Sequence, residues 1–402
     1  MTRLRPLVAA TVAALIAAPA HAFWNDRIEV FADETMTWDT NVFRLSKNLN
    51  NEAALGTSDL GDHFNVHSLG ATLDIPYSLQ RFQAGYTWFA TRYHTFKQLD
   101  FNGHTANANW LWAITPHLTG DLGYADSVSL ANFAVFRGTQ RDLVTARQGY
   151  ANATWAITPT YQLFAGVTRT EREHDDPLRK INDLRANAAE VRASYVNAAD
   201  NRIGVSYRRE EGQQPDQVVL DLPFNNKYRQ DSVGVVGRWV LTGHSTVDGR
   251  ADYVKRDYDQ FSERDYKGPS FRGTWTWTPT GKTSLVTTAY REIAPLDDIQ
   301  TAFVLTRGIT FRPRWDVSAK VAVLGTFDFS KWDYRNGLGV LTPSAPSGDY
   351  THHMRTGGVS VVWRPYRRVM FQAGILREVR TSTLANADYQ VNVFSLEGRI
   401  GF

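Results

Sequence analysis

Charged side chains recur at every second position in one stretch of the chain, where they could bind an anionic ligand. Asp248, Arg250 and Asp252 alternate with glycine and alanine, and Arg256 follows at the same parity. Guanidinium groups bind carboxylates and phosphates through two parallel hydrogen bonds and stay charged at any physiological pH. A surface that carries several of them suits an anionic or heavily hydroxylated ligand, provided that one element brings them together.

A period of two places these charges on one face of a β-strand, because successive strand side chains point to opposite faces. The same alternation recurs along the chain, for example where Phe82, Tyr86 and Trp88 oppose Arg81 and Gln83. Stretches with helical periodicity are hard to find, whereas glycine and threonine are frequent. The sequence therefore predicts an all-β protein.

Two kinds of connection alternate between the predicted strands. Short breaks such as 74–78, 114–117 and 278–282 contain proline, and long polar stretches such as 44–62 and 211–227 lie between them. Eight short turns and about nine long connections give about 18 strands with both termini at the same end. Soluble β-sandwiches have no reason for this asymmetry. We therefore predict a single transmembrane antiparallel β-barrel with short periplasmic turns and longer extracellular loops.

The two ends of the chain agree with this prediction. Residues 1–22 have a basic start, an apolar run of about twelve residues and a small-residue end, the layout of a cleaved secretory signal peptide. That run is shorter than the roughly 20 residues that span a bilayer. Residues 23–402 would then form the outer-membrane barrel of a Gram-negative bacterium, in contact with membrane lipid and lipopolysaccharide.

The final strand alternates apolar and polar side chains and ends on Phe402. By itself it could be the edge of a soluble sheet or the closing strand of a barrel. A terminal aromatic carboxylate resembles the insertion signal of bacterial outer-membrane barrels. The resemblance implies that the barrel-assembly machinery recognises the chain through Phe402.

Composition excludes several classes of protein. The chain has 402 residues and no cysteine, so neither disulfides nor a cysteine metal module can stabilise it. Its 44 basic and 41 acidic residues leave a formal charge of +3, which argues against a nucleic-acid binder. After Phe23 no apolar run is long enough for a membrane-spanning helix. No linker or second domain is apparent.

Parity assigns one strand face to the lumen, and basic residues outnumber acidic residues among the charges considered there. Such a lumen suits the passage of an anionic or hydroxylated polymer, although a self-satisfied network of arginines and carboxylates would look the same. A barrel of this size can hold an aqueous channel, which long loops such as 211–227 could narrow. The predicted lumen path consists of Arg192, Arg202, Arg208, Arg238, Arg250, Arg256, Arg272, Asp248 and Asp252.

The other face ends in a basic residue on several strands that rise from the short turns. We predict that these residues form an outer-leaflet belt that binds lipopolysaccharide phosphates, with arginine giving bidentate contacts. The alternative is that strand ends are simply polar. Tryptophans such as Trp110 and Trp155 lie near short turns, where an interfacial aromatic girdle belongs. The predicted belt consists of Arg92, Arg169, Arg209, Lys255, Arg291 and Arg377.

One motif at the end of the first predicted strand carries a family resemblance. The run from Asp39 through Asn41, Phe43 and Arg44 to Leu45, soon after a signal peptide, looks like the EpsL-like family of outer-membrane proteins. That family is encoded with exopolysaccharide biosynthesis machinery. The resemblance implies export or surface deposition of an exopolysaccharide, with the polysaccharide and periplasmic polysaccharide-export components as partners. On the residues alone, Asn41 could simply turn the chain and Phe43 could lie at the membrane interface.

Enzyme and metal functions find little support in the sequence. His63 and His67 would lie about 13 Å apart on one strand face, too far apart to share a metal. No HExxH, GxSxG or phosphate-loop motif is present. We therefore expect no cofactor, no metal and no catalytic residues. The alternatives to an exopolysaccharide channel are a general or small-solute diffusion porin and a closed structural or adhesive barrel.

Overall fold

A computed structural model describes residues 27–402 except 136–137, 216–217, 220–221, 224–225, 261, 295–302 and 336–348. The predicted signal peptide, residues 1–22, lies outside the described residues. Long strands account for most of the described chain. Their bounds are β1 Ile28–Asp39, β2 Asp62–Tyr77, β3 Gln80–Tyr93, β4 Phe101–Thr115, β5 Leu118–Leu130, β6 Leu143–Ala156, β7 Tyr161–His174, β8 Leu184–Val196, β9 Arg202–Gln213, β12 Tyr228–Thr242, β13 Ser245–Tyr258, β14 Tyr266–Thr280, β15 Thr283–Ala294, β16 Phe303–Asp316, β17 Val321–Arg335, β18 Tyr350–Tyr366, β19 Val369–Ser382 and β20 Tyr389–Gly401.

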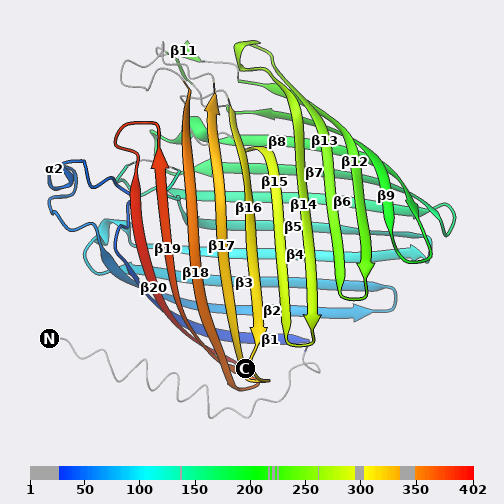
Figure 1. Ribbon diagram of the computed structural model, residues 1–402, viewed down its shortest axis with the longest axis horizontal. Helices are drawn as coiled ribbons and strands as arrows, with labels where there is room; N and C mark the ends of the chain where they lie inside the picture. Colours follow the sequence, from blue (N-terminus) through cyan, green and yellow to red (C-terminus); the bar gives the residue numbers. More distant parts are fainter. Residues whose placement is uncertain are drawn as a thin grey trace.

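These 18 strands form one closed antiparallel barrel. Each strand pairs with the next along the chain, β9 pairs with β12, and β20 closes the sheet by pairing with β1. In Figure 1 the strands β12 to β20 form the near wall, and β1 to β9 cross behind them at a steep angle, as tilted barrel strands do. The predicted all-β barrel of about 18 strands is confirmed.

The minor elements all lie in the connections. They are a two-stranded ribbon, a short α-helix and three 3₁₀ turns, and no described helix is long and apolar enough to cross a membrane. Their bounds are β10 Val218–Val219, β11 Leu222–Pro223, α2 Asn51–Leu55, η1 Lys97–Leu99, η2 Lys180–Asn182 and η3 Ser262–Arg264.

The two ends of the barrel differ as predicted. Eight connections have two to five residues, and the other nine have six to 22 residues. The short turns lie at the end where β1 begins and β20 stops, and Phe402 donates its backbone N–H to Val30 at 2.7 Å there. The hairpins β12–β13 and β14–β15 and the C-terminus lie along the lower edge of Figure 1. By the usual asymmetry this end is periplasmic.

The outer face of the barrel is apolar, because the strand alternation is consistent all the way round. Leu69, Val205 and Ile375 are more than half exposed and share the outward parity. Trp155 and Trp239 lie on the same face close to short turns. In a soluble protein such surface would be a liability, whereas in a membrane it faces lipid.

A hydrophobic cluster joins three of the outer loops. Phe43 from the β1–β2 connection and Phe133 from the β5–β6 connection pack edge to face with ring centroids 5.0 Å apart. Phe96 and Leu99 from the β3–β4 connection, together with Val42 and Tyr93, complete the buried set. Phe43 is only 1% exposed, so it does not lie at the membrane interface, which was the alternative drawn from the sequence.

The β5–β6 connection, residues 131–142 of which 136–137 are not described, turns inward at Ala134. Its Ala134 packs against Met354 of β18 and against Tyr389 and Val391 of β20, all of which have the inward parity. The buried guanidinium of Arg380 on β19 donates to the carbonyl oxygen of Ala134. The sequence predicted that a long loop could narrow the pore, but its example was 211–227 and not this loop.

Candidate functional site

All nine residues of the predicted lumen path lie on five neighbouring strands and share the inward parity. Register places Arg238 opposite Arg202 of β9 and Asp248 of β13, and it places Arg250 opposite Arg272 of β14. We call the inward face of β8, β9, β12, β13 and β14 the basic wall. It carries the seven predicted arginines together with Glu190, Glu210, Asp248 and Asp252.

Part of the basic wall is an internal ion-pair network. Arg250 contacts Glu190 of β8 at 2.9 Å and Asp252 of its own strand at 2.6 Å. The first contact reaches across β9 and β12, which is possible only on the concave inner side of the barrel. Arg208 pairs with Glu210 at 2.8 Å. These pairs satisfy one another, as the alternative drawn from the sequence expected.

Four arginines of the basic wall have no such partner in the described part of the chain, and one of them, Arg256, instead hydrogen-bonds to Gln230 and lies over the ring of Tyr228. The other three are Arg192, Arg202 and Arg238. Within the described residues, no carboxylate oxygen lies within 4.0 Å of the side-chain nitrogens of Arg192, Arg202 or Arg238. Arg202 and Arg238 are direct register neighbours, and the buried Nε of Arg202 has no hydrogen-bond partner. Like charges directly opposite each other in a sheet are destabilising. The arrangement therefore leaves a concentrated positive charge, and a bound anion would compensate it.

Acidic residues dominate the opposite side of the lumen. The order of strands round the barrel places β19, β20, β1 and β2 across from the basic wall. Their inward residues include Arg380 and Arg399 but many more carboxylates. These are Glu29, Asp33, Asp39, Asp62, Asp74, Glu378 and Glu397. Basic residues therefore outnumber acidic residues on the basic wall, whereas the lumen face as a whole is close to balanced in charge.

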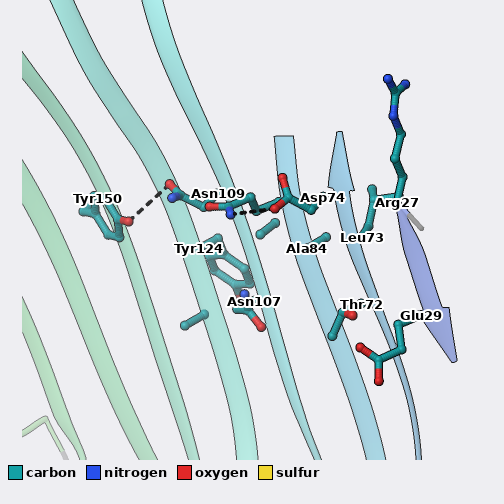
Figure 2. A pocket seen from close by; sticks show the side chains of 13 residues that line it. Arg27, Glu29, Thr72, Leu73, Asp74, Ala84, Asn107, Asn109, Tyr124 and Tyr150 are labelled. Atoms are coloured by element: carbon teal, nitrogen blue, oxygen red, sulfur yellow. Dashed lines mark hydrogen bonds between the residues drawn. The ribbon is translucent and has the colours of Figure 1, made fainter. Parts of the chain in front are cut away.

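A pocket of about 620 Å³ lies on the inner wall from β1 to β6, partly on the acidic side of the lumen and near the periplasmic end. In Figure 2, Tyr150 of β6 points toward Asn109 of β4, and Asn107 lies on the same wall. We call this the amide-lined pocket. The inward side chains that line it are Glu29, Thr72, Asp74, Gln83, Asn107, Asn109, Ala125 and Tyr150.

Burial and aromatic contacts distinguish the outer end of the basic wall. A second inner cavity, of about 350 Å³, is lined by Arg208, Tyr228 and Arg256 among others. The guanidinium of Arg256 lies 4.4 Å from the ring centroid of Tyr228 and donates to the side-chain oxygen of Gln230 at 2.9 Å. Both cavities fall within the range of about 300–1,000 Å³ that holds small molecules.

The six residues of the predicted belt lie on the membrane-facing parity toward the outer ends of their strands, and each has a local partner. Arg169 pairs with Glu171 at 2.5 Å, Arg209 with Asp231 at 2.8 Å and Lys255 with Asp257 at 2.6 Å. The others hydrogen-bond to neutral groups: Arg92 to Asn102, Arg291 to Pro269 and Arg377 to Gln390. The belt is thus basic at six positions but partly neutralised.

The family-motif residues build a turn. The buried side chain of Asn41 donates to the carbonyl oxygen of Leu45 at 2.8 Å and accepts from its N–H at 2.9 Å. Arg44, with a φ of +56°, pairs with Asp39 at 2.8 Å and lies 3.6 Å from Glu378 of β19. The motif therefore ties the first outer loop to the barrel wall.

The structure brings one histidine pair together that the sequence did not. His94 stacks on His63 with centroids 4.3 Å apart, and candidate ligand atoms of these two and Asp62 lie within 4.8 Å of one another. Both oxygens of Asp62 already accept backbone N–H groups of Thr95 and Phe96. The carboxylate of Asp62 therefore has a structural role, which is to hold the backbone of the β3–β4 loop. His67 pairs instead with Glu34.

Comparisons with known proteins agree with the fold. Residues 214–402 match the family described as "Putative beta-barrel porin 2". The barrel is similar to the outer membrane protein OpdK of Pseudomonas aeruginosa, solved with vanillate, with a TM-score of 0.50 and 8% identity over 94% of this chain and 99% of that one. OccK2 (OpdF) of the same organism gives 0.51 and 8% over the same shares. A search of curated proteins finds no match.

The location follows from the fold, its apolar exterior and the porin match. The chain is a porin-like β-barrel of the outer membrane of a Gram-negative bacterium. The matched family is one of porins, which are channels rather than enzymes. The match does not reach the motif at 39–45, so the EpsL-like resemblance stays a prediction.

Proposed function

We propose that this protein is an outer-membrane channel for small solutes and that its basic wall favours small anions. The observation that carries the proposal is the group of inward arginines without carboxylate partners, above all the register neighbours Arg202 and Arg238. A low-dielectric wall with unpaired positive charge raises the local concentration of anions and speeds their entry. The acidic residues on the other side of the lumen would orient a dipolar solute as it passes.

The size of the interior supports a small solute rather than a polymer. Ala134 of the β5–β6 connection packs against inward residues of β18 and β20, so the connection covers part of the lumen. Two recesses in the lumen wall have volumes of about 350 and 620 Å³, the size of a small solute. The exopolysaccharide function rests on the resemblance of the motif at 39–45, whose residues here build a turn. The porin family match also favours the diffusion-porin alternative over export.

The test is ion selectivity in planar bilayers. We expect the purified channel to prefer chloride over potassium in a KCl gradient. Replacing Arg192, Arg202 and Arg238 together by glutamine should shift the reversal potential toward cations, because the unpaired charge is removed. Arg209→Gln on the membrane-facing side is the matched control and should leave selectivity unchanged. A cation-selective pore, or no shift in the triple variant, would refute the role of the basic wall.

We also propose that the predicted basic belt on the membrane-facing side binds lipopolysaccharide. A cavity of about 430 Å³ beside β7, β8, β9 and β12 is lined by Arg169, Arg185 and Arg229, and phosphate groups suit such guanidinium clusters. Glu171 and Glu211 nearby would admit bridging divalent cations. Lipopolysaccharide should copurify less with an Arg169→Gln/Arg209→Gln variant. Equal amounts with wild type would argue for ordinary polar strand ends.

We propose that Phe402 is the residue through which the barrel-assembly machinery recognises the chain. It follows the closing strand and is fixed to β1 by its backbone, so its recognition must precede closure of the barrel. Deleting Phe402 should slow insertion by purified barrel-assembly machinery while leaving spontaneous folding in detergent unchanged. An equal insertion rate would show that the machinery reads another feature.

A further inference from the structure

We infer that the amide-lined pocket binds a neutral, hydroxylated solute of the size of a mono- or disaccharide. The inference deepens the proposed channel function, because it assigns a second substrate class to a different part of the same lumen. It rests on three features of the pocket: the space left by glycines, the unused hydrogen-bonding capacity of the amides, and the balance of charge.

Glycines on the inward parity make room for the polar side chains. A Cβ atom at Gly85 would lie 2.7 Å from Oδ1 of Asn107, and one at Gly123 would lie 2.3 Å from the ring of Tyr150. Contacts this short do not occur between real Cβ atoms and their neighbours, so any larger residue would displace these side chains. The glycines let Asn107 and Tyr150 lie along the wall and keep the pocket open.

The polar groups of the pocket have hydrogen-bonding capacity to spare. Tyr150 donates to Asn109 at 3.3 Å, and Gln83 donates to Asp74 at 3.4 Å, both longer than the usual distance of about 2.9 Å. The exposed amide of Asn107 makes no side-chain hydrogen bond within the described residues. An amide offers both a donor and an acceptor, as does a sugar hydroxyl. Adjacent amides therefore complement a polyhydroxylated ligand.

The charge in and around the pocket is balanced. Asp74 is paired with Arg81 at 2.5 Å, and Glu29 lies 3.7 Å from Arg399. Arg27 contributes one positive charge to the lining, and the inward Asp121 of β5, which accepts from Asn152 beside the pocket, contributes one negative charge. Unlike the basic wall, this surface gives no advantage to an anion. Its volume of about 620 Å³ suits a ligand of one or two sugar rings.

The experiment measures maltose binding to the purified full-length barrel in two ways. One is block of single-channel current by maltose, and the other is calorimetry in a detergent without a sugar headgroup. In an Asn107→Leu/Asn109→Leu variant the half-blocking concentration and the dissociation constant should both rise about tenfold, the effect of losing two ordinary hydrogen bonds. Gln372→Leu, an inward amide on β19, is the matched control and should bind like wild type.

The outcomes separate this inference from the proposed function. If the channel passes anions but maltose neither blocks nor binds, or if the double variant binds as well as wild type, the inference is overturned and the anion channel stands. If the protein does not conduct, the proposed function fails and calorimetry alone decides. Binding that is lost in the double variant and kept in Gln372→Leu would then still support the pocket.

Discussion

Single residues at the outer end decide how the first loop is held. Phe43 is 1% exposed and packs against Phe96 and Phe133, and the side chain of Asn41 bridges the turn that delivers it. Both residues belong to the motif that carries the family resemblance. Their contacts give the motif a structural role, which needs no bound ligand.

Phe43→Ala should loosen the outer loops without unfolding the barrel. Truncating a buried phenylalanine costs about 3–5 kcal/mol, and here the cost falls on a loop cluster that can open locally. Trypsin cleavage after Lys47 should become much faster, while the folded barrel keeps its resistance to heat in detergent. Leu49→Ala, an exposed residue of the same loop, is the control. Unchanged cleavage would mean that the cluster does not hold the loop.

Asp142 should make the inward loop sensitive to acid. Burial favours the neutral carboxyl, but the hydrogen bonds from His174 and the N–H of Asp176 and the charge of Arg179 outweigh it and lower the pKa of Asp142. A lowered folded-state pKa contributes stability that is present above the unfolded value of 3.8 and is lost as pH falls through the folded value. Residues 131–142 should therefore keep their protection from hydrogen exchange from pH 7 to 5.

Below about pH 4 that protection should fall, after correction for the intrinsic exchange rate. In Asp142→Asn the exchange should be faster at neutral pH and should show no further step in acid. A wild-type loop that keeps full protection at pH 3 would contradict the assigned role of Asp142.

In the proposed channel, the connection 131–142 is the element that would limit the width of the pore. Arg380 fixes the inward position of this loop. Its guanidinium donates to the carbonyl oxygens of Ala134 and Ala387 and lies 4.4 Å from the ring centroid of Tyr389. Arg380→Met should release the loop and give a larger and noisier single-channel current. Arg377→Met, on the membrane-facing side of the same strand, is the control. An unchanged current would show that the loop does not limit the pore.

Strands were predictable from the sequence, whereas this loop was not. The parity of a strand is a local pattern. The face on which Phe82, Tyr86 and Trp88 lie can therefore be predicted from the neighbouring residues alone. The partners of Ala134 are Met354 and Tyr389, more than 200 residues away in the sequence. Nothing in the local pattern distinguishes a loop that folds inward from one that extends outward.

The predicted lumen path lies on the inward parity, but it leaves out many of the charges on that face. Parity placed all nine residues on the inner face. The predicted path did not include inward carboxylates such as Asp33, Asp74 and Glu378. These carboxylates lie apart from the basic wall because of which strands face each other across the barrel. The glycine-made space beside Asn107 and Tyr150 likewise requires knowing the register of β3, β4, β5 and β6.

At the scale of the whole molecule, closure of the sheet explains the absence of disulfides and of a large dry core. Each of the 18 strands has two hydrogen-bonded neighbours, so no edge is left to pair with another chain. The apolar side chains face outward to lipid, and the polar side chains face a lumen whose two walls differ in charge. The central claim is that this lumen is a narrow aqueous channel for small solutes.

The most direct test of that claim is single-channel conductance in the presence of polyethylene glycols of graded size. Polymers that enter the pore lower its conductance, and polymers too large to enter do not. We expect a steady conductance that only the smallest glycols reduce, with the size limit rising in Arg380→Met. A pore that admits large glycols would fit a polymer exporter, and a barrel without conductance would fit a closed structural protein. Either result would contradict the account.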